Sequence, residues 1–218
     1  MMPFSLAPNG GVRRILCLGA HSDDIEIGCG GTILRLLDAH PGVDVRWVVL
    51  SGDARREQEA RCAAELFLSG AASRTVTVHG FRDGFFPYDG ARIKELFEEL
   101  KRESAPDLIF THHRDDRHQD HRLVAELTWN TFRDHTILEY EIPKYDGGLT
   151  TPNVFVPIDE PTRTRKVDYL MHAFGSQRSK RWFTEETFCA LLRLRGVESA
   201  SPTGWAESFH GTKLVLAV

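Results

Sequence analysis

The sequence predicts an α/β protein with a Rossmann-like, doubly wound, mostly parallel sheet that is covered by helices on both faces. Two observations lead to this prediction. Short apolar runs rich in β-branched residues alternate with segments of helical periodicity, and the connections between them are short, as is typical of parallel strands joined by crossover helices. The length of 218 residues also suffices for one large α/β domain with a sizeable core.

Five short apolar runs are expected strands because branched and aromatic side chains dominate them. They are RILCLGA, VDVRWVVLS, RTVTVHGF, DLIFTH and TILEYEI, at residues 14–20, 43–51, 74–81, 107–112 and 136–142. Between them, apolar residues recur at helical spacing. The expected helices cover 32–40, 57–68, 91–104 and 121–132. Right-handed crossovers then favour the sheet order 3-2-1-4-5.

The pattern loosens after Pro143. Residues 143–153 are rich in glycine, proline and turn residues, which indicates a loop. Further strands are expected over 153–158 and 212–218, and further helices over 165–177 and 184–196. We expect one domain over residues 1–218, with a core at about 13–142 and a C-terminal extension at 143–218.

Charge and composition argue against several classes of protein. The net charge of -4 disfavours binding to a nucleic-acid backbone. No apolar run approaches the roughly 20 residues of a transmembrane helix, and residues 1–11 lack the pattern of a signal peptide. The four cysteines lie far apart, as expected for buried thiols in a reducing compartment; they are Cys17, Cys29, Cys62 and Cys189. A cytoplasmic location is therefore expected.

Two polar clusters follow expected strands. The first is HSDD at 21–24, directly after the first strand, and the second is HQDH at 118–121, after the fourth. In the order 3-2-1-4-5, strands one and four are neighbours where the winding reverses, and their C-terminal ends open into one crevice. We therefore expect the two clusters to face each other.

These residue types suit a catalytic metal site. Zinc binds imidazole nitrogen and carboxylate oxygen, and a catalytic zinc site uses three protein ligands and a water. Of the adjacent Asp23 and Asp24, one can bind the ion while the other acts as a base toward that water. A remaining histidine can face the developing oxyanion. Iron(II) would accept the same donors, and the residue types alone leave open which histidines bind.

Simpler explanations exist for each cluster. Two aspartates before a glycine-rich segment can cap a helix, and HQDH can lie on a surface, but their joint position at neighbouring strand ends favours a site. The segment GCGGT at 28–32 is not the GxGxxG fingerprint. The acidic pair would also repel a pyrophosphate, so a nicotinamide oxidoreductase is disfavoured. We assign these glycines to tight turns and helix packing.

The motif AHSDD with a downstream HQDH resembles the LmbE/PIG-L family of metal-dependent N-deacetylases, whose motifs are AHPDD and HPDH. The resemblance covers residues 13 to about 142 in motif order and spacing, and AESF at 206–209 is similar to a late stretch of many members. Ser22 and Gln119 replace the two prolines of the motifs. The tyrosine that some members place before the second motif is absent, and Asp116 stands nearby.

The resemblance implies a role for each residue of the two clusters. The metal ligands would be His21, Asp24 and His121. Asp23 would be the general base, a protonated His118 would stabilise the oxyanion, and Asp120 would hold His118 and tune its charge. Arg56, in REQEA, and Asp83, after the third strand, would contact substrate hydroxyls; a surface arginine and a turn aspartate are the simpler interpretations.

The function implied is that of a zinc-dependent hydrolase that removes the N-acetyl group from an N-acetylated amino sugar of the N-acetylglucosamine type and releases acetate. Self-association is common among proteins of this kind, so a homo-oligomer is consistent with the resemblance. Two other functions stay open. One is a metal-dependent amidase acting on a non-sugar amide, and the other is a non-catalytic Rossmann-like module that binds a sugar or nucleotide.

Overall fold

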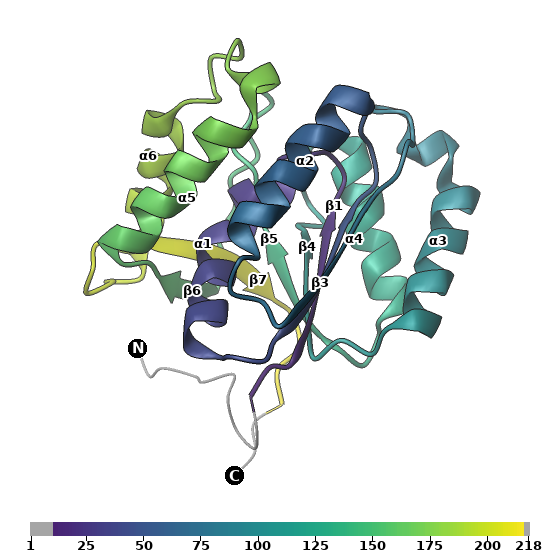
Figure 1. Cartoon of the computed structure of the whole chain (residues 1–218), viewed down its shortest axis with the longest axis horizontal. Helices are drawn as coiled ribbons and strands as arrows, with labels where there is room; N and C mark the ends of the chain where they lie inside the picture. The colour runs from purple at the N-terminus through teal and green to yellow at the C-terminus, as the bar shows by residue number, and fades with distance from the viewer. Residues whose placement is uncertain (1–10, 216–218) are drawn as a thin grey trace.

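Seven strands form one mixed sheet with helices on both faces in the computed structural model, which describes residues 11–215 (Figure 1). The strands are β1 (Arg14–Gly19), β2 (Asp44–Val49), β3 (Ser73–Val78), β4 (Leu108–His112), β5 (Thr136–Tyr140), β6 (Val154–Pro157) and β7 (Ala206–Gly211). The α-helices are α1 (Asp24–Ala39), α2 (Ala54–Phe67), α3 (Gly90–Glu103), α4 (Gln119–Thr131), α5 (Glu160–Ala173) and α6 (Glu185–Glu198). Two short 3-10 turns are η1 (Phe86–Tyr88) and η2 (Gly175–Gln177).

The strand order is β3-β2-β1-β4-β5-β7-β6. Strands β1 to β5 are parallel, which confirms the predicted α/β fold and its central order. Strand β7 pairs antiparallel with both β5 and β6. The strand expected over 212–218 is wrong in its described part, because residues 212–215 form none and the strand lies at β7 instead. The expected absence of a signal peptide concerns residues 1–11, of which 1–10 lie outside the described range. Residues 216–218 lie outside it as well.

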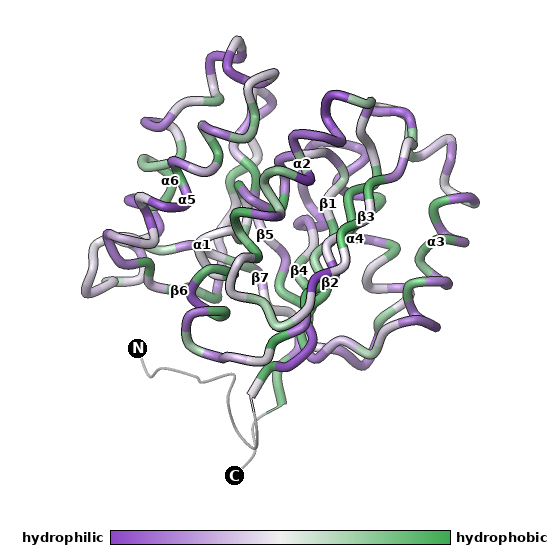
Figure 2. The backbone as a smooth tube through the Cα atoms, in the orientation of Figure 1, coloured by the Kyte–Doolittle hydropathy of each residue, from purple (hydrophilic) through white to green (hydrophobic). Residues whose placement is uncertain are grey.

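The sheet is the middle of three layers. In β1, Ile15 and Cys17 face a core shared with α1, α2 and α5, whereas Leu16 and Leu18 face a core shared with α3 and α4. Strands buried on both faces read as continuous apolar runs, as in β4, whose five residues are all buried. Figure 2 shows hydrophobic stretches of tube among the central strands, whereas β2 and β3 also carry hydrophilic residues. Among residues 11–215, no helix is long and apolar enough to cross a membrane.

Helix α1 begins at Asp24, well before the expected start at residue 32, because its glycines lie inside the helix. A Cβ at Gly28 would stand 2.3 Å from the Tyr140 ring, and one at Gly30 would stand 2.5 Å from the Phe67 ring. Each glycine weakens a helix by about 1 kcal/mol relative to alanine. Helix propensity therefore does not predict a helix over the glycine-rich segment 28–32. The packing role predicted for these glycines is confirmed, whereas the predicted tight turn is wrong because they lie inside α1.

Strand β7 braces α1 through a buried ion pair. The Glu207 carboxylate accepts hydrogen bonds from the backbone N–H groups of Gly31, at 2.7 Å, and Thr32, at 2.6 Å. The Lys166 ammonium donates to the same carboxylate at 2.6 Å and to the carbonyl of Ile27 at 2.6 Å. The side chains of Glu207 and Lys166 are 2% and 3% exposed. The AESF segment therefore contributes a structural carboxylate.

Replacing Glu207 by Leu should lower the free energy of unfolding by about 3–5 kcal/mol, because it leaves the Lys166 ammonium buried without its anion. Denaturant unfolding measures this change. The control is Asp38→Leu, which removes the partner of Arg165 from an exposed pair and should cost less than about 1 kcal/mol. Equal losses in the two variants would contradict the role of burial, and the Lys166→Met/Glu207→Leu double variant should recover part of the loss.

Candidate active site

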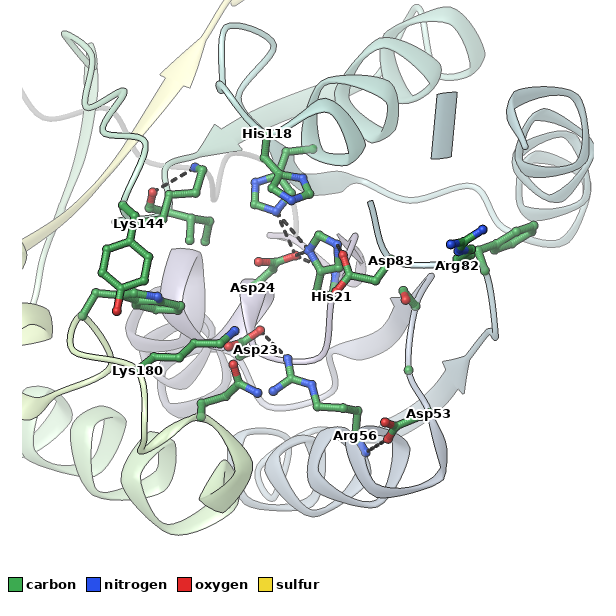
Figure 3. Close-up of a pocket in the computed structure, with 18 of the residues that line it drawn as sticks. His21, Asp23, Asp24, Asp53, Arg56, Arg82, Asp83, His118, Lys144 and Lys180 are labelled. Atoms are coloured by element: carbon green, nitrogen blue, oxygen red, sulfur yellow. Dashed lines mark hydrogen bonds and ion pairs between the residues drawn. The ribbon is translucent and has the colours of Figure 1, made fainter. Parts of the chain in front are cut away.

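The C-terminal ends of β1 and β4 bring the two polar clusters together (Figure 3). His21 lies just after β1, Asp24 is the first residue of α1, and His121 lies in the first turn of α4. Helices α1 and α2 cover one face of the sheet and α3 and α4 the other. The crevice between β1 and β4 is thus the point where the winding reverses, which is where such sheets bind ligands.

Three donor atoms of these residues form a small triangle. His21 Nδ1 is 3.3 Å from Asp24 Oδ2 and 3.2 Å from His121 Nε2, and the third side, from His121 Nε2 to Asp24 Oδ2, is 3.5 Å. In a tetrahedral zinc site with ligand distances of about 2.0–2.1 Å, neighbouring donors lie roughly 3.3–3.4 Å apart. The triangle therefore fits a divalent cation. His21, Asp24 and His121 are brought together as the sequence predicts.

A carboxylate stands behind each histidine of this triangle. Asp116 Oδ2 is 3.0 Å from His121 Nδ1, and Asp120 Oδ2 is 3.2 Å from His21 Nε2. Histidines that bind metals usually donate their second N–H to such a partner, which fixes the ring and the tautomer. Burial and the neighbouring His112 lower the pKa of His121 to about 3. The imidazole is thus held in the neutral form that binds metals.

Asp120 lies differently from its expected place. Its carboxylate accepts the N–H groups of Gly84, at 2.7 Å, and Phe86, at 3.1 Å, and faces His21 rather than His118. Its contact with His118 is made by the backbone, whose N–H donates to His118 Nδ1 at 3.3 Å. This local cap arises because Asp120 follows His118, the N-cap of α4, by two residues.

His118 is therefore set as a neutral donor. Because Nδ1 accepts a hydrogen bond, the proton of the neutral ring is on Nε2. Burial and the nearby His21 lower the pKa of His118, which differs from the expectation of a protonated ring. His118 lines the same cleft as His21, Asp23 and Asp24, so its Nε2–H is available to a ligand there.

Asp23 is held by Arg56. The guanidinium of Arg56 donates to Asp23 Oδ1 at 2.8 Å, and the two side chains are 17% and 7% exposed. Burial raises the pKa of the Asp23 carboxyl, and the charge of Arg56 opposes that shift. Arg56 thus lies in the cleft as predicted, but its guanidinium binds an acidic side chain.

Asp83 also reaches the site. Its carboxylate oxygen Oδ1 is 3.0 Å from His21 Nε2, while 74% of its side chain is exposed. Hydrogen bonding to His21 lowers the pKa of Asp83. The same nitrogen faces Asp120 at 3.2 Å. Asp83 therefore stands at the rim of the cleft between solvent and the histidine cluster.

Sequence reasoning missed His112. This fully buried residue at the end of β4 stacks on His121 with ring centres 3.9 Å apart. Its Nε2 accepts the N–H of Ala20 at 2.9 Å and lies 3.2 Å from Asp24 Oδ2. A histidine at the C-terminal end of a central strand is the signal in the sequence that points to it.

The cleft has a volume of about 750 Å³, within the range of small-molecule sites. One wall comes from the segments after β1, β2, β3 and β4, and the other from the C-terminal extension, with Lys144, Tyr145, Gln177, Lys180 and Trp182. Sequence reasoning assigned no role to these five residues. Nothing in their local pattern signals that they face the metal-type cluster, because the fold of the extension alone places them there.

The sequence is similar to a protein family and to individual deacetylases. The model of the family described as GlcNAc-PI de-N-acetylase (PIG-L) matches residues 16–132, the stretch that holds both polar clusters. An uncharacterized deacetylase of Escherichia coli K12, YaiS, is 30% identical over 170 residues, which cover 72% of this chain and 89% of that protein. The diacetylchitobiose deacetylase of Thermococcus kodakarensis is 28% identical over 133 residues, or 51% of this chain and 48% of that protein.

Two solved structures show how widely the fold is shared. The N,N'-diacetylchitobiose deacetylase of Pyrococcus horikoshii has a TM-score of 0.70 at 22% identity, covering 92% of this chain and 84% of that one. GalB, the 4-carboxy-2-hydroxymuconate hydratase of Pseudomonas putida KT2440, has a TM-score of 0.71 at 19% identity, covering 94% and 98%. At these identities the likeness concerns the fold alone, and the fold is shared by a deacetylase and a hydratase.

Proposed function

Because the chain belongs to the PIG-L family, we propose that it is a zinc-dependent deacetylase that removes the acetyl group from the amide nitrogen of an N-acetylated amino sugar of the N-acetylglucosamine type. Deacetylation is the activity in the names of the family and of the two relatives above. The zinc ion, the sugar and the individual residue roles are the parts that belong to this proposal.

One observation carries the proposal. The donor atoms of His21, Asp24 and His121 lie within 3.5 Å of one another, and Asp23 and His118 line the same cleft. A ligand triangle with a further carboxylate and an imidazole N–H beside it is the arrangement that amide hydrolysis at a metal requires.

His21, Asp24 and His121 would hold the ion, which when bound would polarise the amide carbonyl and lower the pKa of water. Asp23 takes a proton from the attacking water, and the Arg56 contact orients its carboxylate. The Nε2–H of His118 donates to the oxyanion of the tetrahedral intermediate. The proton held by Asp23 then passes to the leaving amine, and acetate and the free amino sugar depart.

The test is acetate release by the purified chain loaded with zinc. N-acetylglucosamine glycosides should yield equal amounts of acetate and primary amine, and dialysis against a chelator should abolish both. A parallel set of non-sugar acetamides separates the sugar deacetylase from a general amidase, and an unsaturated hydroxy acid tests the hydratase chemistry of GalB, which shares the fold. Hydrolysis that survives complete removal of the metal would overturn the proposal.

Replacing His118 by Ala should lower kcat by about 10²- to 10³-fold, the usual effect of removing one donor to an oxyanion. Zinc content should stay at the wild-type level, because His118 lies outside the proposed ligand set. Steady-state kinetics and elemental analysis of the same sample check both statements. A full kcat in this variant would remove His118 from the mechanism.

We also propose that residues 1–218 form a single domain. In support, β7 pairs with β5 of the core and β6 with β7, so the C-terminal extension completes the same sheet. Helix α5 packs on the face of the sheet that α1 and α2 cover.

A further inference from the structure

We propose that residues 175–182 of the C-terminal extension form a recognition subsite for an oxyanion, a phosphate or a carboxylate, carried on a hydroxylated part of the substrate next to the N-acetyl group. The inference rests on the proposed function and narrows the class of substrate. It assigns Lys180 to the negative charge and Gln177 to a hydroxyl group.

This segment is anchored to the catalytic side of the cleft. The Glu59 carboxylate, on α2, accepts the N–H of Ser176 at 2.7 Å and its hydroxyl at 2.5 Å. The Ser176 oxygen in turn accepts hydrogen bonds from Arg56, at 3.3 Å, and from the Nε2 of Gln177, at 2.9 Å. Ser176, near the start of the segment, is therefore hydrogen-bonded to Arg56, the residue that orients Asp23. Contacts within the fold thus fix the backbone of the segment at this point.

Gln177 holds an unused acceptor within the wall of the cleft. Its side chain lines the cleft, and the residue is 5% exposed. Its Nε2 is occupied by Ser176, whereas Oε1 is buried and has no hydrogen-bond partner in the part of the chain that the structure describes. Buried polar atoms are nearly always paired. A ligand hydroxyl donating to Oε1 satisfies this atom.

Lys180 presents an unused cation to the same space. Within residues 11–215 its Nζ has no ion pair, and it lies 5.6 Å from the centre of the Trp182 ring. Figure 3 shows the side chain reaching from the C-terminal wall toward Asp23.

The other cations of the cleft are engaged. Arg56 pairs with Asp23 at 2.8 Å, and Lys144 pairs with Asp116 at 2.6 Å. Arg82 and Lys180 are both exposed. Figure 3 shows that Arg82 points away from His21 and Asp23, and its guanidinium lies 3.5 Å from the centre of the Phe85 ring. Lys180 is thus the lining cation that faces the reaction centre with its charge free for a ligand.

The two groups together select a ligand chemistry. An ammonium forms a strong, charge-assisted hydrogen bond with phosphate or carboxylate oxygens, and an amide oxygen accepts only from a donor such as a hydroxyl. A neutral acetylated sugar would satisfy Gln177 and leave Lys180 unused. A sugar with an acidic substituent satisfies both.

The experiment compares acetate release from four substrates by the full chain with zinc. They are N-acetylglucosamine 1-phosphate, its neutral counterpart methyl N-acetyl-α-glucosaminide, N-acetylmuramic acid and N,N'-diacetylchitobiose. We expect a higher kcat/KM for a charged substrate than for the methyl glycoside, and the better of the phosphate and the carboxylate identifies the oxyanion. Lys180→Met should reduce the ratio of these two kcat/KM values about tenfold or more, and Lys180→Arg should restore most of it.

The matched control is Lys101→Met, which removes an exposed lysine of α3 and should leave the ratio unchanged. Calorimetry with the Asp23→Asn variant measures binding of N-acetylglucosamine 1-phosphate without turnover, and adding Lys180→Met should weaken it by a similar factor. Equal kcat/KM values for charged and neutral sugars would overturn this inference, and so would a Lys180→Met variant that keeps both the kcat/KM ratio and the affinity. Either result would leave the proposed deacetylase activity in place. No acetate from any substrate overturns the proposed function, and calorimetry still decides the role of Lys180.

Discussion

Asp23→Asn should lower kcat by about 10²- to 10⁴-fold, the range that a positioned general base contributes. The amide keeps the size of the carboxylate and an oxygen that can still accept the hydrogen bond of Arg56, so the shape of the cleft is preserved. What is lost is the ability to take a proton from water. The zinc content should remain that of the wild type, because the triangle of donors involves Asp24 and not Asp23.

Kinetics and elemental analysis on one preparation test this expectation. The control is Asp168→Asn on the exposed side of α5, which should change neither quantity. An Asp23→Asn variant with wild-type kcat would exclude Asp23 as the base. A variant that loses its zinc would instead make Asp23 a ligand and would require a different base.

His121→Ala should abolish stable zinc binding and with it deacetylase activity. His121 Nε2 lies 3.2 Å from His21 Nδ1 and 3.5 Å from Asp24 Oδ2 in the donor triangle. Without it, two protein ligands would remain. The loss in metal affinity should exceed the roughly 10- to 100-fold effect of substituting an outer partner such as Asp116. Elemental analysis after gel filtration measures the metal, and the wild type should also show a zinc-dependent rise in Tm that the variant lacks.

An exposed histidine provides the comparison for this second result. His172 lies in the last turn of α5, and His172→Ala should keep the metal, the activity and the rise in Tm. Wild-type zinc content in His121→Ala would contradict the assignment of the ligands and would direct attention to His112, which stacks on His121 and faces Asp24.

The central part of the fold was predictable because β1 and β4 are buried on both faces. An apolar run such as RILCLG carries its own signal, and the alternation with amphipathic helices determines the parallel order. Strand β7 was missed for the opposite reason. Its polar residues Glu207 and Ser208 are buried. Their hydrogen-bond partners, Lys166 and Glu141, lie elsewhere in the sequence, so a local pattern cannot reveal that these residues form a strand.

The grouping of His21, Asp24 and His121 could be predicted because it depends only on which strands are neighbours. The contacts of Asp120 could not, since its carboxylate is directed by the N–H groups of Gly84 and Phe86, in a loop after another strand. The position of Gln177 and Lys180 in the cleft could not be predicted either. Their place in the cleft depends on Glu59 holding Ser176, a contact between residues distant in the sequence.

The brace between Glu207 and α1 has a consequence for biosynthesis. Gly31, in the middle of the helix that begins with Asp24, is translated 176 residues before Glu207, whose carboxylate fastens it. Until Glu207 is made, burial of Lys166 in its native place would leave the ammonium without its counter-charge. The nascent protein should thus remain loosely assembled around its first helix, and competence to take up metal should arise only after residues 206–211 have emerged.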